Sequence, residues 1–408
     1  MKLKENKKLT VALVYDRVNT QYGGAEIVLT ALQELFPNAP IYTSVYHKKK
    51  AEWAKNSTII PSFLQNIPFC NDKHQYLLPL MPLAFESFDL SNYDLIISVT
   101  SAEAKGILTK PNQKHICYML TPTRYLYSHK KEYLNSKWYL QLPGIKQIVG
   151  ILFDHITNWD QSASMRPDIL IPISKLVANR IKTYYHRTPA RVIYPPVAIP
   201  LSETEIEKIP QFNQTHRFCL SVSRLVDYKR VDLSILSCLQ LKKPLVVVGT
   251  GESEQKLHSL ASTDSLIKET TETIEDFLQR GTRENKTILF TGSLAQKDVY
   301  KLYKNCESVL MPGQEDFGIT ALEAGIFGKP VILFYTSGVA ELLKDSVDAI
   351  HIKKETVAEM VYALGKLDSF GFNASHIKET VKSHSTQQFK KEFKQQIEKE
   401  LKGNYVIS

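Results

Sequence analysis

The chain has 408 residues, 43% of them hydrophobic and 23% charged, which is the composition of a soluble globular protein. This length exceeds one ordinary hydrophobic core, so we expect two domains. The formal net charge of +9 favours contact with polyanions or an anionic membrane surface, and lysine used for solubility explains it equally well. A nucleic-acid partner would rest on this charge alone and is not expected.

The cysteines and the apolar runs indicate the compartment. The five cysteines are scattered, no pair has metal-ligand spacing, and an odd count argues against a disulfide framework. The first apolar run, residues 9–15, ends at Asp16 and Arg17 and is too short for a signal peptide. No apolar run approaches the ~20 residues of a membrane-spanning helix. We therefore expect a cytoplasmic protein in a reducing environment.

The first half of the chain alternates predicted strands with predicted helices. The pair Gly23 and Gly24 lies between the first strand and a stretch with apolar residues at helical spacing. Such a pair lets a ligand approach the backbone closely, although a simple turn explains it equally well. Ser174 is expected to cap a helix over residues 175–185. The predicted strands cover residues 10–15, 41–45, 95–99, 114–119 and 168–173.

Two segments of the first half are rich in aromatic and apolar residues. Residues 61–82 could receive an apolar or extended acceptor, but buried packing accounts for most of them. Residues 127–164 mix lysines with tyrosine, tryptophan and aliphatic residues, a composition that can lie on a membrane interface. Ordinary helices on the rim of the domain are an equally good interpretation.

A proline-rich joint separates the two halves. Pro195 and Pro196 fix an extended path, and residues 198–216 are polar and read as irregular. We expect an N-terminal domain over residues 1–198 and a C-terminal domain over residues 199–385. A charged amphipathic helix over about residues 386–402 is expected to pack back on the first domain.

The second half repeats the alternation, with predicted strands at residues 217–222, 244–248, 287–290, 308–311 and 330–334. Repeated strand–helix units with short loops indicate a parallel sheet with helices on both faces. The predicted fold class is therefore α/β, with two Rossmann-like, doubly wound domains. Ligands are expected at the carboxyl ends of the strands, in the cleft between the domains.

An anion site is predicted after the strand at residues 308–311. The loop of Asp316, Phe317 and Gly318 opens a helix at about Ile319, and backbone N–H groups at a helix N-terminus attract anions. Two acids, Glu315 and Glu323, would flank such an anion. A phosphate between hydroxyl-bearing groups describes a nucleotide sugar. An ordinary strand–loop–helix with solvated acids is the alternative.

Two cations follow the strand at residues 217–222. Arg224 can grip a phosphate with two hydrogen bonds, while Lys229 supplies a point charge. Each alone would be a solvated cation by default. Together, in the same domain as the anion site, they favour a diphosphate.

Other nucleotide chemistries are not supported. Gly249 and Gly251 begin a dinucleotide-binding fingerprint, but Glu254 stands where the third glycine is required. No Walker lysine follows a glycine-rich loop, and the histidines do not pair at metal-ligand spacing. NAD binding, ATP hydrolysis and a metal site are therefore not expected.

Several short motifs lie along the chain. The second half contains Ser223-Arg224 with Lys229, Val248 to Glu252, Phe290 to Gly292, Glu315 to Thr320 with Glu323 to Gly325, and Gly328 to Ile332. With these motifs it closely resembles the retaining glycosyltransferases of family 4, which have the two-domain GT-B fold. The first half contains Gly23 to Glu26, Cys117-Tyr118, Thr121 to Tyr125, Trp159-Asp160 and Tyr194 to Val197. With these it resembles the mannosyltransferase-like branch of that family, which builds bacterial cell-surface polysaccharides.

The resemblance implies roles for single residues. Arg224 and Lys229 would bind the donor diphosphate and, with Glu315, form the catalytic set, in which Glu315 holds hydroxyls of the donor sugar. Glu323 would bind the ribose, and Gly24 would let a loop of the first domain close on the diphosphate. The other donor-binding residues implied are Gly249, Asp316, Phe317, Gly318, Ile319 and Thr320.

The resemblance also implies the reaction and its partners. A hexose would move to a hydroxyl of a glycan or lipid-linked glycan, with retention of its anomeric configuration. Mannose from GDP-mannose is the first choice of donor. No cofactor and no metal would be needed, because Arg, Lys and helix N-termini stabilise the leaving diphosphate. The protein would be cytoplasmic, with peripheral contact to the anionic inner face of the cytoplasmic membrane.

The chain departs from the family pattern at two positions. Leu120 stands where relatives have a histidine that contacts the donor sugar, and Ile173 stands where they usually have asparagine. Either the donor preference differs, or a neighbour such as Thr121 or Arg124 takes over a sugar or acceptor contact. The alternative is a weak or inactive homologue that binds nucleotide sugar or glycan, or that partners an active transferase.

Overall fold

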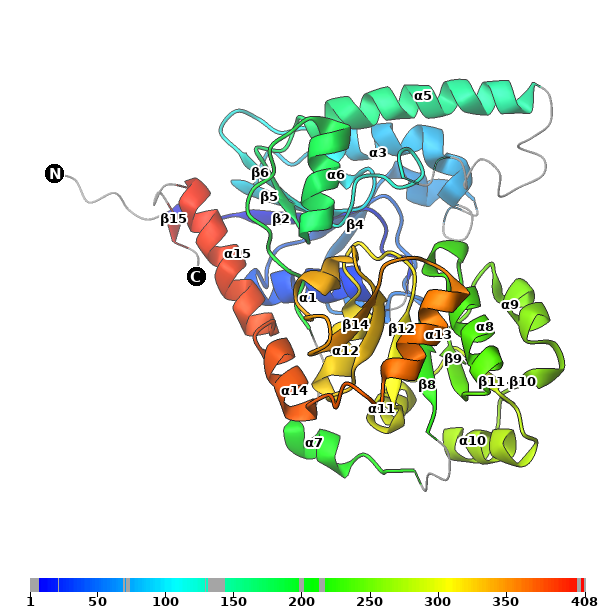
Figure 1. The fold of residues 1–408 in the computed structure, drawn as a ribbon. Helices are drawn as coiled ribbons and strands as arrows, with labels where there is room; N and C mark the ends of the chain where they lie inside the picture. The colour runs from blue at the N-terminus through cyan, green and yellow to red at the C-terminus, as the bar shows by residue number, and fades with distance from the viewer. Residues whose placement is uncertain are drawn as a thin grey trace. The chain divides into compact units, whose positions relative to one another are not determined.

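The computed structural model describes residues 7–20, 22–68, 70, 74–128, 130, 144–197, 202–212, 217–401 and 405–406. The chain divides into two compact units (Figure 1). The first comprises Met1–Pro196 together with Thr386–Ser408, and the second comprises Val197–Ser385. The boundaries therefore fall directly after Pro196 and after Ser385.

The first unit contains a six-stranded sheet in which every pair of strands is parallel. Two of its central strands are buried along their length and a third is buried from His115 to Met119, as expected when helices cover both faces of a parallel sheet. In spatial order the strands are β4 (Ile59–Pro61), β3 (Ile41–Thr43), β2 (Val11–Tyr15), β5 (Leu95–Thr100), β6 (Lys114–Met119) and β7 (Ile169–Pro172).

Helices of the first unit connect these strands. The predicted cap is confirmed, because the Ser174 side chain accepts a hydrogen bond from the Val177 N–H, at 3.1 Å, at the start of α6. The α-helices are α1 (Gly24–Leu35), α3 (Met81–Glu86), α5 (Ile145–Ser164) and α6 (Lys175–Tyr185). The 3₁₀ helices are η1 (Glu52–Ala54), η2 (Phe63–Asn66), η3 (His74–Leu80) and η4 (Ala104–Gly106).

The C-terminal helix α15 (Thr386–Leu401) belongs to the first unit. Phe389 and Phe393 pack edge-on against Tyr118 of β6, with ring centroids 5.7 and 5.8 Å away. Lys390 forms an ion pair with Glu34 of α1, at 2.8 Å. Beyond this helix, β15 (Tyr405–Val406) pairs in parallel with β1 (Lys7–Lys8). Aromatic packing and pairing of the chain ends thus hold the C-terminal segment on this unit.

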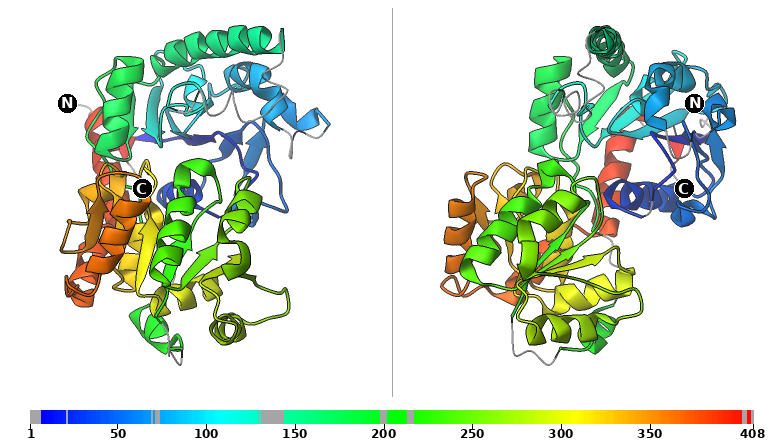
Figure 2. Two further views of the ribbon diagram at one scale, coloured as in Figure 1. Left: turned by 45° about the vertical axis from the view of Figure 1, so that its right-hand side comes forward. Right: turned by 90° about the vertical axis from the view of Figure 1, so that its right-hand side faces the viewer.

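The second unit contains a seven-stranded parallel sheet with helices on both faces (Figure 2). In spatial order its strands are β10 (Ser265–Ile267), β11 (Ile288–Gly292), β9 (Leu245–Val248), β8 (Cys219–Val222), β12 (Ser308–Met311), β13 (Val331–Phe334) and β14 (Ala349–Ile352). The doubly wound α/β prediction is confirmed for both sheets.

Helices α8 and α13 pack together on the sheet of the second unit, and α12 packs against α14. The α-helices are α7 (Glu203–Lys208), α8 (Val231–Leu241), α9 (Glu254–Ala261), α10 (Ile274–Arg283), α11 (Gln296–Asn305), α12 (Ile319–Ile326), α13 (Val357–Lys366) and α14 (Ala374–Lys382). The 3₁₀ helices are η6 (Asp227–Lys229), η7 (Ser262–Asp264) and η8 (Gly338–Glu341).

One expectation from the sequence is wrong in part. The stretch over residues 198–216 is not irregular throughout, because α7 lies within it. The Ser202 hydroxyl accepts from the Glu205 N–H, and the Glu205 carboxylate accepts from the Ser202 N–H at 2.8 Å. This reciprocal capping box stabilises a helix of only six residues. Residues 198–201 and 213–216 of that stretch lie outside the described residues.

The two aromatic segments divide between burial and exposure. In the first, Leu64 and Met81 are fully buried, whereas Tyr76 is exposed. In the second, residues 129 and 131–143 lie outside the described residues, and α5 forms residues 145–164. Within the described ranges, no helix has both the length and the apolar character needed to cross a membrane.

Candidate functional site

The residues singled out in the second half meet at the carboxyl edge of the second unit's sheet. Arg224 and Lys229 lie in the loop between β8 and α8, Gly249 follows β9, and Glu315 lies between β12 and α12. These three strands are neighbours in the order β9-β8-β12. Open α/β sheets bind ligands at this edge, so the fold brings the predicted residues to the expected place.

Lys229 and Glu315 are in direct contact, 86 residues apart in the sequence. The Lys229 ammonium donates to the Glu315 carboxylate, and the two side chains are only 18% and 11% exposed. The backbone of Glu315 is fixed on both sides. Its N–H donates to the Ser337 hydroxyl at 3.0 Å, and its carbonyl accepts from the Gly338 N–H at 3.0 Å. The pair is therefore a largely buried cation and anion held in one position.

Arg224 is more exposed than Lys229. One of its guanidinium nitrogens donates to the Tyr228 hydroxyl at 3.1 Å. The Tyr228 ring also lies 5.4 Å from the Lys229 ammonium, measured to the ring centroid. Tyr228 thus touches both predicted cations of this loop, a role that the sequence did not reveal.

The loops at this edge pack backbone against backbone. A Cβ on Gly249 would lie 1.9 Å from the Ser223 carbonyl oxygen, and Gly249 has a φ of +128°. A Cβ on Gly313 would lie 2.2 Å from the Tyr228 carbonyl oxygen. Only glycine fits at either position. The three loops therefore form one close-packed rim.

Helix α12 starts in this rim. Its N-cap is Gly318, which has no side chain with which to cap the helix. Phe317 and Asp316 are buried, and the Phe317 carbonyl accepts from the Val339 N–H at 2.7 Å. Ile319 and Thr320 form the half-buried first turn. The partial positive charge of this N-terminus is thus available to an anion.

Glu323 lies in the next turn of α12. The Tyr303 hydroxyl of α11 donates to its carboxylate at 2.8 Å. Burial raises the pKa of Glu323 to about 7, and the hydrogen bond from Tyr303 opposes this rise. Glu323 is therefore a carboxyl group that titrates near neutral pH.

The first unit's sheet has its own carboxyl edge, where Leu120, Thr121 and Arg124 follow β6. The Leu120 N–H donates to the Thr100 carbonyl at 2.8 Å, which leaves its apolar side chain half-buried at the strand exit. The Thr121 hydroxyl accepts from Arg180 at 3.2 Å. Gly24 is exposed and is the first residue of α1.

A buried ion pair lies beneath this edge. The Lys105 ammonium donates to the Asp160 carboxylate at 2.5 Å, and the two side chains are 0% and 1% exposed. Asp160 also accepts from the hydroxyls of Thr123, Tyr127 and Tyr185, at 2.7, 3.0 and 2.9 Å. The pair joins the loops after β5 and β6 to α5 and α6. Sequence patterns do not predict this pair, because lysine is almost always exposed.

Asp16 and Glu103 extend this network. Asp16 accepts from the Thr100 hydroxyl at 2.7 Å and from the N–H groups of Ser101 and Ala104 at 2.7 and 2.8 Å. Glu103 accepts a hydrogen bond from the Tyr125 hydroxyl, and burial raises its pKa. The loops after β2, β5 and β6 are thereby tied together through buried carboxylates.

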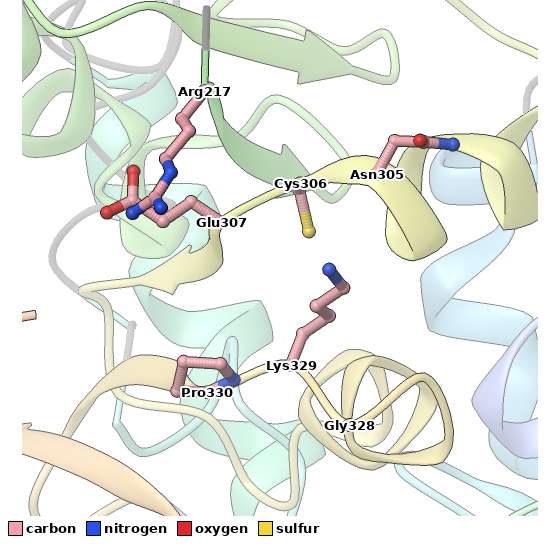
Figure 3. A pocket seen from close by; sticks show the side chains of 7 residues that line it. All are labelled: Arg217, Asn305, Cys306, Glu307, Gly328, Lys329 and Pro330. Atoms are coloured by element: carbon pink, nitrogen blue, oxygen red, sulfur yellow. The ribbon is translucent and has the colours of Figure 1, made fainter. Parts of the chain in front are cut away.

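A cavity of about 280 Å³ lies elsewhere, at the amino edge of the second unit's sheet (Figure 3). It is lined by Arg217, Cys306, Glu307 and Lys329 among others, which precede β8, β12 and β13. Burial lowers the pKa of Lys329, whose amine points toward the Cys306 sulfur. This cavity is separate from the rim that holds Lys229 and Glu315.

No three histidine, cysteine, aspartate or glutamate side chains are arranged to hold a metal ion in the part of the chain that the structure describes.

Comparison with known proteins identifies similar chains. Residues 202–369 match the family model of glycosyl transferases group 1. The chain is 29% identical to the α-1,3/1,6-mannosyltransferase ALG2 of Saccharomyces cerevisiae over 229 residues, which are 50% of this chain and 45% of that protein. It is 27% identical to the O-antigen chain mannosyltransferase C of Escherichia coli over 154 residues, 37% and 36% of the two chains. These matches span less than half the length of the curated relatives.

Solved structures match over nearly the whole chain. The lipopolysaccharide outer core galactosyltransferase WaaB superposes with a TM-score of 0.60 at 16% identity, covering 96% of this chain and 99% of that one. HepE of Anabaena in complex with UDP superposes with a TM-score of 0.64 at 16% identity, covering 95% and 100%. At this identity the likeness concerns the fold.

Proposed function

We propose that the protein transfers a hexose from a nucleotide-diphosphate sugar. The premise is that residues 202–369 are a glycosyl transferases group 1 domain in a chain with the GT-B fold. The observation that carries the proposal is the Lys229–Glu315 pair at the carboxyl edge of the second unit's sheet. In this proposal the Lys229 cation binds a phosphate and the adjacent Glu315 carboxylate binds sugar hydroxyls.

Each group of the rim has a task in this reaction. Lys229 and Arg224 bind the donor diphosphate and stabilise the charge that develops as it leaves. The N-terminus of α12 adds backbone N–H groups. Glu315 accepts hydrogen bonds from hydroxyls of the sugar, and Glu323 accepts them from the ribose. The protein thereby supplies positive charge without a metal, and the acceptor hydroxyl attacks on the face that the diphosphate leaves, with retention.

Mannose from GDP-mannose is the proposed donor, because two curated relatives are named mannosyltransferases. The proposed acceptor is a hydroxyl of a glycan or lipid-linked glycan in the synthesis of a surface polysaccharide. HepE has the same fold and was solved with UDP, so the base must be tested separately from the sugar.

A thermal-shift panel of nucleoside diphosphates and their sugars tests this proposal. A ligand at 100 times its Kd stabilises the folded state by about 2.7 kcal/mol. We expect GDP and GDP-mannose to raise the Tm more than the uridine and adenosine compounds do. If no nucleotide diphosphate or nucleotide sugar raises the Tm, the donor site proposed here is wrong.

A second candidate function is favoured by Leu120. Its apolar side chain at the exit of β6 has no donor or acceptor for a sugar hydroxyl, where family members have a histidine. The protein would then bind nucleotide sugar or glycan without turnover, or partner an active transferase. Binding without turnover of any donor, together with gain of activity in Leu120→His, would favour this candidate over the first.

Donor binding should depend on pH through Glu323. Only the ionised carboxylate accepts fully from the ribose hydroxyls, and its pKa is about 7 in the free protein. The fraction ionised falls about tenfold between pH 8 and pH 6, so the Kd for the donor should rise about tenfold over that range. Isothermal titration calorimetry measures this directly. Glu323→Gln should bind more weakly at pH 8 but show no pH dependence. A wild-type Kd that does not change with pH would contradict the role of Glu323.

Peripheral membrane contact is proposed for α5. Ile145, Ile148 and Ile151 recur every third residue on this helix and are 39%, 68% and 71% exposed. Such a stripe beside Lys146 suits an anionic lipid interface. We expect binding to vesicles with anionic lipid at low salt, weakened by Ile148→Ser with Ile151→Ser and unaffected by Ile267→Ser in the second unit. Equal vesicle binding by the wild type, the α5 double variant and Ile267→Ser would contradict this proposal.

A further inference from the structure

A second set of contacts joins the two loops that carry Lys229 and Glu315, one residue away from each. Arg230 directly follows Lys229, and Gln314 directly precedes Glu315. Glu355, which lies before α13, bridges them. Its Oε2 accepts from Arg230 Nη1 at 2.8 Å, and its Oε1 accepts from the Gln314 N–H at 3.3 Å. One carboxylate thus links the guanidinium of Arg230 in one loop to the backbone N–H of Gln314 in the other.

Arg230 is fixed from the other side by Asp232. Its Nε and Nη2 donate to the two carboxylate oxygens of Asp232, each at 3.1 Å. The hydrogen bond to Asp232 is the main reason that the pKa of Arg230 is raised. The side chains of Arg230, Asp232 and Glu355 are about one-third exposed, and such ion pairs add little to stability. Two-point contact with a planar guanidinium does, however, define its orientation.

The backbone at Arg230 is in an unfavourable conformation. Its φ of +53° and ψ of +37° lie in the left-handed region, which costs residues with a Cβ and costs glycine nothing. Non-glycine residues keep such a conformation only where their surroundings enforce it, and they are concentrated at functional sites. At Arg230 these surroundings are the carboxylates of Asp232 and Glu355, which hold its guanidinium.

We propose that Arg230 and Glu355 are positioning residues, which set the separation of Lys229 and Glu315 for the donor. This inference rests on the proposed donor site. Neither residue needs to touch the donor. Arg230 positions Lys229, which precedes it in the chain. Glu355 positions Glu315 through its contact with Gln314.

Arg230→Gly separates the side-chain contacts from the backbone conformation, because glycine adopts the left-handed region freely. We expect the variant to remain folded, with kcat/KM for the donor about tenfold or more below that of the wild type, since misplacing a catalytic group by about 1 Å can cost about a hundredfold. Glu355→Gln should have the same effect. The KM for the acceptor should not change in either variant, which distinguishes positioning of the donor groups from a general loss of structure.

Glu272→Gln is the matched control. Arg280 donates to both oxygens of Glu272, at 2.8 and 2.7 Å, in an ion pair of the same chemistry near β10, at the far edge of the same sheet. This variant should keep wild-type donor kinetics. If Arg230→Gly and Glu355→Gln keep them as well, the inference is wrong.

Hydrogen exchange without any donor separates this inference from the proposed function. The amides of residues 314–317 should exchange faster in Arg230→Gly and Glu355→Gln than in the wild type, because the bridge that restrains this loop is lost. Unchanged exchange would overturn the inference whatever the reaction is. Faster exchange in a protein that binds no nucleotide sugar would support the bridge while overturning the proposed function.

Discussion

Replacing Lys229 by methionine should lower the rate of sugar transfer at least about a hundredfold, which is the usual effect of removing one group that stabilises developing charge. The variant loses the cation that contacts Glu315 and that is proposed to hold the donor diphosphate. It also leaves the Glu315 carboxylate next to the incoming phosphates without its counter-charge. Steady-state kinetics with the donor, together with circular dichroism of the variant, measures the effect on the folded protein.

Lys243→Met is the matched control for this prediction. Lys243 pairs with Glu307 at 2.8 Å, and their side chains are 20% and 11% exposed, against 18% and 11% for Lys229 and Glu315. The control pair lies at the amino edge of the same sheet, away from the proposed site. Both variants should lose similar stability, and only Lys229→Met should lose transfer. Equal activity in the two variants would exclude the proposed role of Lys229.

The second large effect concerns stability. Lys105→Met should lower the free energy of unfolding of the first unit by about 3–5 kcal/mol, the usual cost of removing one partner from a buried ion pair. The Asp160 carboxylate would remain 1% exposed, with three hydroxyl donors but no cation. Denaturant unfolding followed by circular dichroism measures the loss.

Lys114→Met provides the comparison. Lys114 pairs with Asp168 at 3.0 Å in the same unit, but these side chains are 38% and 37% exposed. Exposed pairs contribute about 0–1 kcal/mol, so this variant should change stability little. If both variants lose the same small amount, the Asp160 carboxylate that Lys105→Met leaves without a cation is not a costly buried charge.

The central strands and the edge strand β7 could be predicted from the sequence, whereas the edge strands β4, β10 and β14 could not. β2 and β5 are mainly apolar runs of five and six residues buried along their length, and β6 is buried from His115 to Met119. This pattern indicates a strand between two helical layers. The edge strands β4 and β10 have three residues each and are only partly buried. Such short segments carry no periodicity to detect.

The sequence of helix α7 carries a local capping signal and no hydrophobic periodicity. Ser202 and Glu205 have the spacing of a capping box, but the surrounding stretch is polar and offers no apolar stripe. Local caps of this kind stabilise a short helix without a buried face, so hydrophobic periodicity misses it.

At the candidate site, the sequence identified residue types and the structure supplied the partners. Arg224, Lys229 and Glu315 could be selected because they follow strands. The contact of Glu315 with Lys229, and the bridge through Glu355, depend on which strands are neighbours in the sheet. Sequence spacing does not determine that order. The pKa of Glu323 likewise depends on burial beside Tyr303, which lies on another helix.

The most direct test of the proposed reaction is transfer itself. The protein is incubated with GDP-mannose and a glycan or lipid-linked glycan acceptor, and the products are weighed by mass spectrometry and their anomeric configuration is read by NMR. We predict an acceptor heavier by one hexose, linked with the configuration of the donor, and release of GDP that depends on Lys229. Binding of the donor without transfer to any acceptor, or product with inverted configuration, would contradict the account.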